Sequence, residues 1–173
     1  ICNRLDRNTS GIVAAGKTMN GLQKLSAHFK DRTLNKYYIC IVKGEITKRQ
    51  LVNGYLKKDH SSNRVTIYKQ LPDDILSDKN MPANDKNTDK SEYMPIETEY
   101  IPVVSNGRIT LLKIHLITGR SHQIRAHLAS LSHPLAGDYK YGDASFNQYF
   151  ADKYFCRNQM LHSYEIDIPD MNI

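Results

Sequence analysis

Cysteine is scarce in this 173-residue sequence: Cys2, Cys40 and Cys156 are its only three, and they lie far apart. An odd number of cysteines at such spacing suits neither a disulfide framework nor a set of zinc ligands. We therefore expect a reducing, cytoplasmic environment. No apolar run approaches the roughly 20 residues that cross a bilayer, and no signal-peptide pattern is present, so the sequence predicts no membrane partner.

The signatures of several enzyme classes are also missing. The sequence contains no glycine-rich phosphate loop and no Gly-x-Ser-x-Gly nucleophile elbow. His122 and His127 are five residues apart, which places them on different faces of a helix, and this differs from the zincin spacing. The sequence therefore predicts no metal site.

Acidic residues are rare in the first part of the chain. Residues 1–71 carry 14 Lys and Arg against 4 Asp and Glu, whereas residues 72–99 carry 3 against 8. A basic surplus concentrated in one segment is typical of a protein with a polyanionic partner. A basic protein without such a partner is the alternative that charge alone leaves open.

The pattern of apolar runs predicts the fold class. Apolar residues make up 40% of the chain and charged residues 24%, which is typical of a globular protein. We expect an α+β fold, with a mixed, largely antiparallel β-sheet and flanking helices and loops. Short apolar or β-branched runs bounded by turn residues predict strands within residues 11–17, 36–46, 54–70 (two strands), 95–105, 108–117 and 160–168.

Turn and capping residues place the connections. Asn106-Gly107 predicts a β-hairpin, and Thr18 and Ser121 are each expected to cap a helix. In the first helix an apolar face is expected in the core, and it consists of Met19, Leu22, Leu25 and Phe29.

We expect one domain over residues 1–173. Residues 72–93 are polar and net acidic, so they are interpreted as a mobile loop within it. The chain starts on Ile rather than Met, and an interesting acidic residue, Asp6, lies close to its start. We therefore expect the domain to be truncated at the N-terminus, and at the C-terminus as well.

The opening stretch "ICNRLDRNTSGIVAAGK" has two interpretations. Asp6 is a turn former, because Asp, Asn, Thr, Ser and Gly are the usual loop residues. Alternatively, the turn holds Asp6 still as a reactive carboxylate between Arg4 and Arg7. This stretch alone does not decide between them.

A second stretch, "ITGRSHQIRAHLA", combines two arginines with the start of a predicted helix. Arg120 precedes the helix, His122 lies in its first turn and Arg125 in the second. Arginines and helix N-termini both attract anions, so a phosphate or carboxylate site is one interpretation. An ordinary amphipathic helix with a solvated polar face is the other.

Four segments together resemble the successive motifs of the RluA-type pseudouridine synthases, a family that contains bacterial enzymes modifying large-subunit ribosomal RNA. They are "NRLDRNTSGIVAAGK", "NKYYICIVKG", "LITGRSHQIRAHLASLSHPLAGDYKYGD" and "MLHSYEIDIP", and they occur in that order. The first and third are long and specific, so their joint occurrence is far stronger than a lone short motif. Asn3 stands where many members carry His.

The resemblance implies roles for individual residues. Asp6 falls at the family's catalytic aspartate, Tyr38 at its active-site tyrosine, and Arg125 at the arginine that pairs with the aspartate. Leu161 is expected to line the same pocket. RNA-binding roles are expected for Arg4, Arg7, Arg120 and His122, with Arg4 entering the space that the target base vacates.

The function that the resemblance implies is isomerisation of uridine to pseudouridine in RNA, without cofactor or metal. Ribosomal RNA (23S) is the expected partner, with transfer RNA as the alternative, and we expect a monomer. Two other classes stay open at this point. A non-catalytic RNA-binding module needs only the basic face, and a phosphotransferase could use Asp6 and Thr9 but should carry a second Asp where Asn8 stands.

Overall fold

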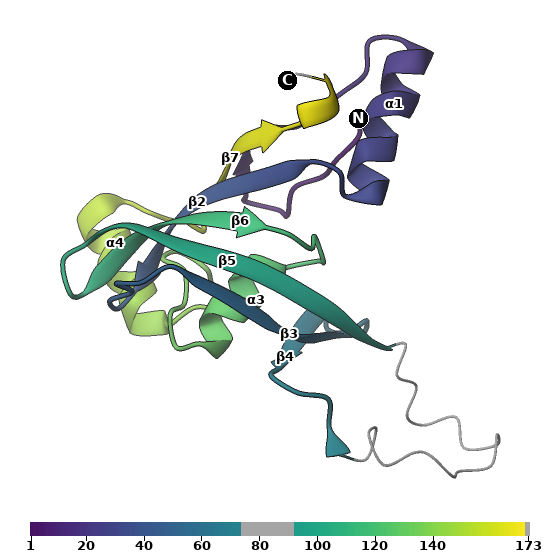
Figure 1. Cartoon of the computed structure of the whole chain (residues 1–173). Helices are drawn as coiled ribbons and strands as arrows, with labels where there is room; N and C mark the ends of the chain where they lie inside the picture. Colours follow the sequence, from purple (N-terminus) through teal and green to yellow (C-terminus); the bar gives the residue numbers. More distant parts are fainter. Residues whose placement is uncertain (74–91, 172–173) are drawn as a thin grey trace.

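A seven-stranded sheet organises the chain, for which a computed structural model describes residues 1–73 and 92–171 (Figure 1). The strand order is β1-β7-β2-β6-β5-β3-β4, and neighbouring strands are antiparallel except for β1 and β7, which are parallel. The expected α+β class with a mixed, largely antiparallel sheet is therefore confirmed. The strands are β1 (Ser10–Gly11), β2 (Asn35–Lys43), β3 (Gln50–Asp59), β4 (Arg64–Tyr68), β5 (Tyr93–Ser105), β6 (Ile109–Leu116) and β7 (Leu161–Asp167).

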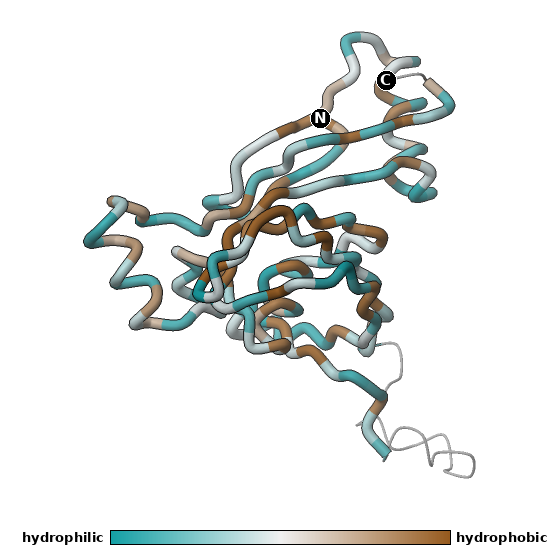
Figure 2. Tube along the Cα trace, turned by 60° about the vertical axis from the view of Figure 1, so that its left-hand side comes forward, coloured by the Kyte–Doolittle hydropathy of each residue, from teal (hydrophilic) through white to brown (hydrophobic). Residues whose placement is uncertain are grey.

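The core lies between the middle of the sheet and one helix, α3 (Gln123–Ser130). Side chains alternate along a strand, so one face of β2 and β6 contributes Cys40 and Leu112, which lie opposite each other in the ladder. Ile124 and Leu128 of α3 pack against them. Apolar residues accordingly gather where the strands cross the centre of the molecule (Figure 2).

A second helix, α4 (Ala144–Tyr154), was not predicted from the sequence. It begins at Asp143, whose side chain accepts a hydrogen bond from the backbone N–H of Phe146 at 2.8 Å, an ordinary N-cap. Phe146 and Phe150 pack near Ile41 and Ile109, whose side chains point to the sheet face opposite Cys40 and Leu112. The chain ends in the 3₁₀ turn η2 (Pro169–Met171).

The predicted hairpins are confirmed. β5 and β6 are joined at Asn106-Gly107, where the Asn106 side chain accepts hydrogen bonds from the backbone of Arg108 and Ile109. β3 and β4 are joined by the polar turn at Ser61–Asn63. The predicted loop at 72–93 lies mainly in residues 74–91, outside the described part of the chain, and Tyr93 is already the first residue of β5.

Helix α1 (Met19–Asp31) corrects one expectation. Thr18 is its N-cap, as predicted, but none of its residues is buried and Met19 is 69% exposed. The helix lies beside the end of the sheet at β7 and β2, away from α3 and α4, so its apolar face does not meet the central core (Figure 1). One member of that face, Phe29, instead lines a cleft described below. No helix in the described ranges is long and apolar enough to span a membrane.

Two further local expectations were wrong. The strand predicted over residues 11–17 is limited to Ser10–Gly11, after which Ile12 and Val13 are exposed. The chain leaves the sheet there because Gly11 has a φ of +115°, far from strand values. Helix α3 is not capped by Ser121 but begins after His122, which has a left-handed backbone.

Replacing Gly11 by Ala is expected to destabilise the fold by about 3 kcal/mol, because the backbone is strained for any other residue. A Cβ atom there would also clash with the backbone oxygen of Ser163 in β7. Gly107→Ala is the matched control, since Gly107 also has a positive φ but its Cβ would meet nothing within 4 Å. Urea denaturation should show the larger loss for Gly11→Ala. Equal losses would mean that the close approach to β7 is unimportant.

Candidate active site

A tight turn presents Asp6. The backbone N–H of Thr9 donates to the carbonyl oxygen of Asp6 at 3.0 Å, and Asn8 takes a φ of +71°, a conformation that Asn tolerates better than most residues. The Thr9 hydroxyl accepts a hydrogen bond from Gln159 Nε2 at 2.5 Å. The turn thus spans Asp6–Thr9, and Gln159, from near the end of the sequence, supports it through the Thr9 hydroxyl.

Asn3 fixes the segment before this turn. Its side chain accepts a hydrogen bond from the backbone N–H of Ala14 at 2.8 Å and donates to the carbonyl of Ile12 at 3.3 Å. The Ser10 hydroxyl lies 2.8 Å from Nδ1 of His162 in β7. Asn3 therefore connects the two stretches of chain that flank the Asp6 turn.

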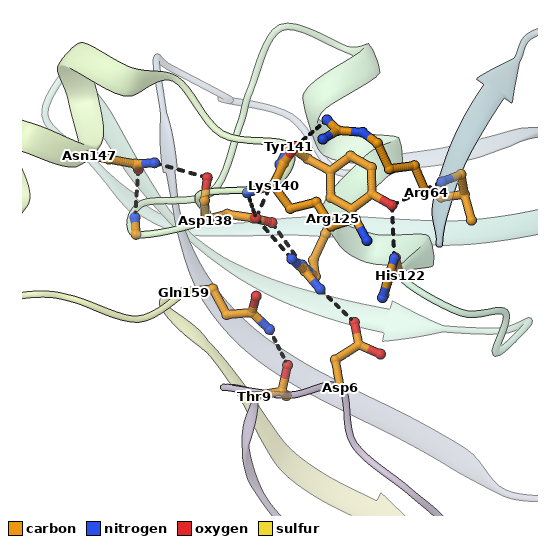
Figure 3. Close-up of polar contacts among 12 residues, drawn as sticks. Asp6, Thr9, Arg64, His122, Arg125, Asp138, Lys140, Tyr141, Asn147 and Gln159 are labelled. Atoms are coloured by element: carbon orange, nitrogen blue, oxygen red, sulfur yellow. Dashed lines mark hydrogen bonds and ion pairs between the residues drawn. The ribbon is translucent and has the colours of Figure 1, made fainter. Parts of the chain in front are cut away.

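Arg125, from the buried side of α3, connects Asp6 to the core (Figure 3). Its Nη1 donates to Asp6 Oδ2 at 3.1 Å, while Nε and Nη2 donate to the two oxygens of Asp138 at 2.8 and 2.9 Å. The Asp138 side chain is 1% exposed and that of Asp6 is 26% exposed. One guanidinium therefore bridges a buried carboxylate and a carboxylate open to solvent.

Arg125 and Asp138 are both ionised in spite of their burial. Burial disfavours the charge of Asp138, but hydrogen bonds from Arg125 and from the backbone of Lys140 and Tyr141 outweigh it and hold the pKa of Asp138 below its ordinary value. Burial also disfavours the charge of Arg125, but Asp138 and Asp6 keep the pKa of that guanidinium above its ordinary value. Arg125 is therefore a fixed positive charge beside Asp6.

Asp6 and Arg125 line a cleft of about 230 Å³. This is smaller than the pockets that hold drug-sized ligands, which measure roughly 300–1,000 Å³. The sequence-predicted residues that line the cleft are Arg4, Asp6, Tyr38, Arg120, His122, Arg125 and Leu161. Arg7 is exposed and does not line it.

Two titratable side chains in the cleft are neutral at neutral pH. Burial raises the pKa of Tyr38 above its ordinary value, the charge of Asp6 adds to the effect, and a hydrogen bond with Ser163 opposes it. Burial lowers the pKa of His122, and Arg125 and Lys140 add to that effect while Asp6 opposes it. His122 Nδ1 lies 2.8 Å from the Tyr141 hydroxyl, which itself accepts from the backbone N–H of Val65 at 3.0 Å.

Sequence reasoning missed Asp138, to which it assigned no role. The only available signal was an acidic residue directly after the apolar "HPLAG", a place where a charge needs a partner if the segment is buried. Gln123 was also missed. It is 2% exposed, and its side chain bonds to the backbone N–H of Arg120, to both Thr98 and Thr118, and to the carbonyl of Glu97.

The arrangement suits carboxylate chemistry. A carboxylate held beside a fixed guanidinium, with one side open to a cleft, can act as a nucleophile or a base. Within the described ranges no group of three or more His, Cys, Asp or Glu side chains is placed to hold a metal ion. Asn8, which stands where a phosphotransferase should carry a second Asp, serves the turn described above.

The known proteins that this chain resembles are pseudouridine synthases, and the similarity extends over nearly its whole length. A model of the family described as RNA pseudouridylate synthase matches residues 1–130. An uncharacterized RNA pseudouridine synthase of Mycoplasma genitalium is 35% identical over 172 residues, which cover 98% of this chain and 46% of that protein. The ribosomal large subunit pseudouridine synthase D of Borreliella burgdorferi is 30% identical over 97% of this chain and 44% of its own length.

A solved structure supports the fold. The human RNA Pseudouridylate Synthase Domain Containing 4 superposes with a TM-score of 0.75 over 98% of this chain and 67% of that chain, at 20% sequence identity. The chain spans about half the length of the first two curated relatives it is compared with here.

Proposed function

Because the chain belongs to the RNA pseudouridylate synthase family, we propose that its protein isomerises uridine in RNA to pseudouridine, with Asp6 as the catalytic residue. The observation that carries the proposal is the contact of Asp6 with Arg125 in the cleft. The two residues come from motifs more than a hundred positions apart. A non-catalytic RNA-binding module would have no need to bring a carboxylate into a cleft whose other charged side chains are cationic.

The reaction is an isomerisation. The bond between N1 of uracil and C1′ of ribose breaks, the base turns, and C5 bonds to C1′; the C5 proton is lost and N1 gains a proton. Atoms and electrons therefore balance within the nucleotide, and the reaction itself requires no oxidant and no group donor. The reagent it needs is an ionised carboxylate, which acts either as nucleophile or as base toward the ribose. Arg125 holds the Asp6 carboxylate in place through the hydrogen bond from Nη1 at 3.1 Å.

Tyr38 and Leu161 are proposed to hold the base. Tyr38 is buried in β2 and borders the cleft, and its raised pKa keeps its hydroxyl protonated. Its ring offers a stacking surface for uracil, and the protonated hydroxyl offers a hydrogen bond. Leu161, at the start of β7, closes the cleft with an apolar side chain.

The target base has to leave the RNA stack to reach Asp6, at a cost of a few kcal/mol, so loops and ends of RNA are the favoured substrates. Arg4 is exposed and lines the cleft, which fits a side chain that enters the space left by the base. The basic first part of the chain would supply affinity for phosphates irrespective of sequence.

We propose ribosomal RNA as the substrate, with transfer RNA as the alternative. Relatives include ribosomal large subunit pseudouridine synthases C and D, and also a tRNA pseudouridine synthase C of Salmonella typhi, 29% identical over 96% of this chain and 61% of its own length.

Pseudouridine mapping of total RNA from cells with and without the protein tests the activity and the substrate together. We expect at least one pseudouridine of large-subunit ribosomal RNA to disappear and to return when the natural gene is restored. A loss confined to transfer RNA would identify the alternative substrate. An unchanged map in all RNA would contradict the proposed function.

A further inference from the structure

We propose that Lys36 and Arg120 form a phosphodiester-binding subsite at the cleft, which holds a backbone phosphate of the RNA next to the nucleotide that reacts. The proposal rests on the proposed function, because it takes RNA as the ligand of this cleft. It gives a specific place to Lys36, which the charge pattern includes only as one of the basic residues in the first part of the chain.

Lys36 is an ammonium group with no counterion in the described part of the chain. It extends from the start of β2 to the loop between β6 and α3, where its Nζ would lie only 2.9 Å from a Cβ atom placed on Gly119. The side chain is part-buried, and among the described residues it has neither a hydrogen-bond partner nor an ion pair. Burial and the nearby charge of Arg32 lower its pKa from the ordinary value. A bound anion would oppose both effects, because a nearby negative charge favours the charged form of Lys36.

Arg120 presents a second unpaired donor on the same loop. Its Nε is buried from solvent and has no hydrogen-bond partner among the described residues. A buried donor without a partner costs free energy comparable to a lost hydrogen bond, so a phosphate oxygen that accepts from Arg120 would be favoured. The loop itself is rigidly held, because Gln123 accepts from the Arg120 backbone N–H at 3.0 Å and from the Thr118 hydroxyl at 2.9 Å.

The charge balance of the cleft favours an anion. Of the residues that the structure describes, Asp6 is the only acidic one that lines it, and Asp6 is already paired with Arg125. Lys36, Arg120 and Arg4 also line it, and none of the three is in an ion pair among the described residues. A phosphodiester fits this setting, because every nucleotide inside an RNA strand has a phosphate on each side of its ribose. Lysine and arginine are the usual phosphate ligands.

Gly119 allows a test that removes no charge. Its φ lies outside the left-handed region, so Ala fits the backbone, but the added Cβ would occupy the place beside Lys36 Nζ. The end of a lysine side chain is free to move, so Gly119→Ala should fold normally with Lys36 displaced. Lys36→Met removes the charge and keeps the length of the side chain. Lys153→Met is the control, because Lys153 is an exposed lysine on α4, away from the cleft.

The measurement is binding of a fluorescein-labelled RNA stem-loop with uridines in the loop to the intact natural protein. Fluorescence anisotropy is recorded over a series of KCl concentrations. Lys36→Met should weaken binding about tenfold, as expected for a charged hydrogen bond. It should also make the slope of log K against log [KCl] shallower by about 0.7, the value for one phosphate of a single strand. Gly119→Ala should also weaken RNA binding, as Lys36→Met does. Lys153→Met should bind RNA like the natural protein.

Binding is measured separately from turnover, so the two proposals can fail separately. If Lys36→Met and Gly119→Ala bind with unchanged affinity and slope while the natural protein forms pseudouridine, the subsite is wrong and the proposed function stands. If the weakening occurs but no RNA acquires pseudouridine, the subsite stands as an RNA phosphate site and the proposed function is wrong. If Lys36→Met and Lys153→Met weaken binding equally, or if Gly119→Ala binds like the natural protein, the effect of Lys36→Met is one of general charge and the subsite is wrong.

Discussion

Replacing Asp6 by Asn is expected to abolish pseudouridine formation and to leave RNA affinity almost unchanged. Asn has the shape of Asp and can still accept a hydrogen bond from Arg125, so the turn and the cleft should persist. It cannot serve as the nucleophile or base that the isomerisation needs. Even a thousandfold loss corresponds to about 4 kcal/mol of transition-state stabilisation. Single-turnover pseudouridine assays, run beside filter-binding titrations, separate the two quantities.

Asp31→Asn is the matched control for this experiment. Asp31 is an exposed acid at the end of α1 and does not line the cleft, and its replacement changes the net charge by the same amount. We expect Asp31→Asn to retain the full rate. Near-normal turnover by Asp6→Asn would show that Asp6 is not the catalytic residue, whatever its contact with Arg125.

Arg125→Met is expected to reduce both turnover and stability, the latter by about 3–5 kcal/mol. The loss is large because the substitution leaves Asp138, 1% exposed, as a buried charge without a cation. A second substitution, Asp138→Asn, removes that charge but keeps an acceptor for the backbone N–H groups of Lys140 and Tyr141. The double variant should regain most of the stability in urea denaturation and still lack turnover. A double variant no more stable than Arg125→Met would show that the unpaired charge is not the cause.

The contact between Arg125 and Asp138 also makes the free energy of unfolding depend on pH, with a sign that can be worked out. In the natural protein the folded-state pKa of Asp138 lies below its ordinary value, so its stabilisation is present above about pH 4 and is lost as the pH falls through the lowered pKa. In Arg125→Met, burial without a partner should raise the pKa of Asp138 instead. Acidification then protonates Asp138, which removes the unpaired buried charge and makes the variant less unstable relative to the natural protein. The natural protein and Arg125→Met should therefore differ less in their free energy of unfolding as the pH falls. A difference that stays constant with pH would contradict this explanation.

The parts of the fold that could be predicted are those with local signals. The strands around Tyr38 and Leu161 are apolar or β-branched runs bounded by turn residues, and the hairpin at Asn106-Gly107 has a specific turn sequence. The convergence of Asp6 with Arg125 could be expected only from the order of the motifs, because no local pattern reports a contact between residues so distant.

The missed features depend on tertiary contacts. The apolar face of α1 has the spacing of a core helix, but the spacing does not tell where the helix lies, and this helix lies at the end of the sheet. Asp138 looks like a loop residue until Arg125 is placed beside it. Lys36 is one lysine among many in a basic segment, and its place in the cleft beside Gly119 distinguishes it.

The attachment of the Asp6 segment has a consequence for local unfolding. Asp6 precedes β1, a two-residue strand at the outer edge of the sheet, whereas Tyr38 and Arg125 belong to the core. Edge segments held by few hydrogen bonds open at lower free energy than the core, and amide hydrogen exchange reports this difference. We therefore expect Asp6 to separate from Arg125 at a lower free energy than the sheet unfolds. An RNA strand bound by both Arg4 and Lys36 would join the edge to the core and oppose that opening.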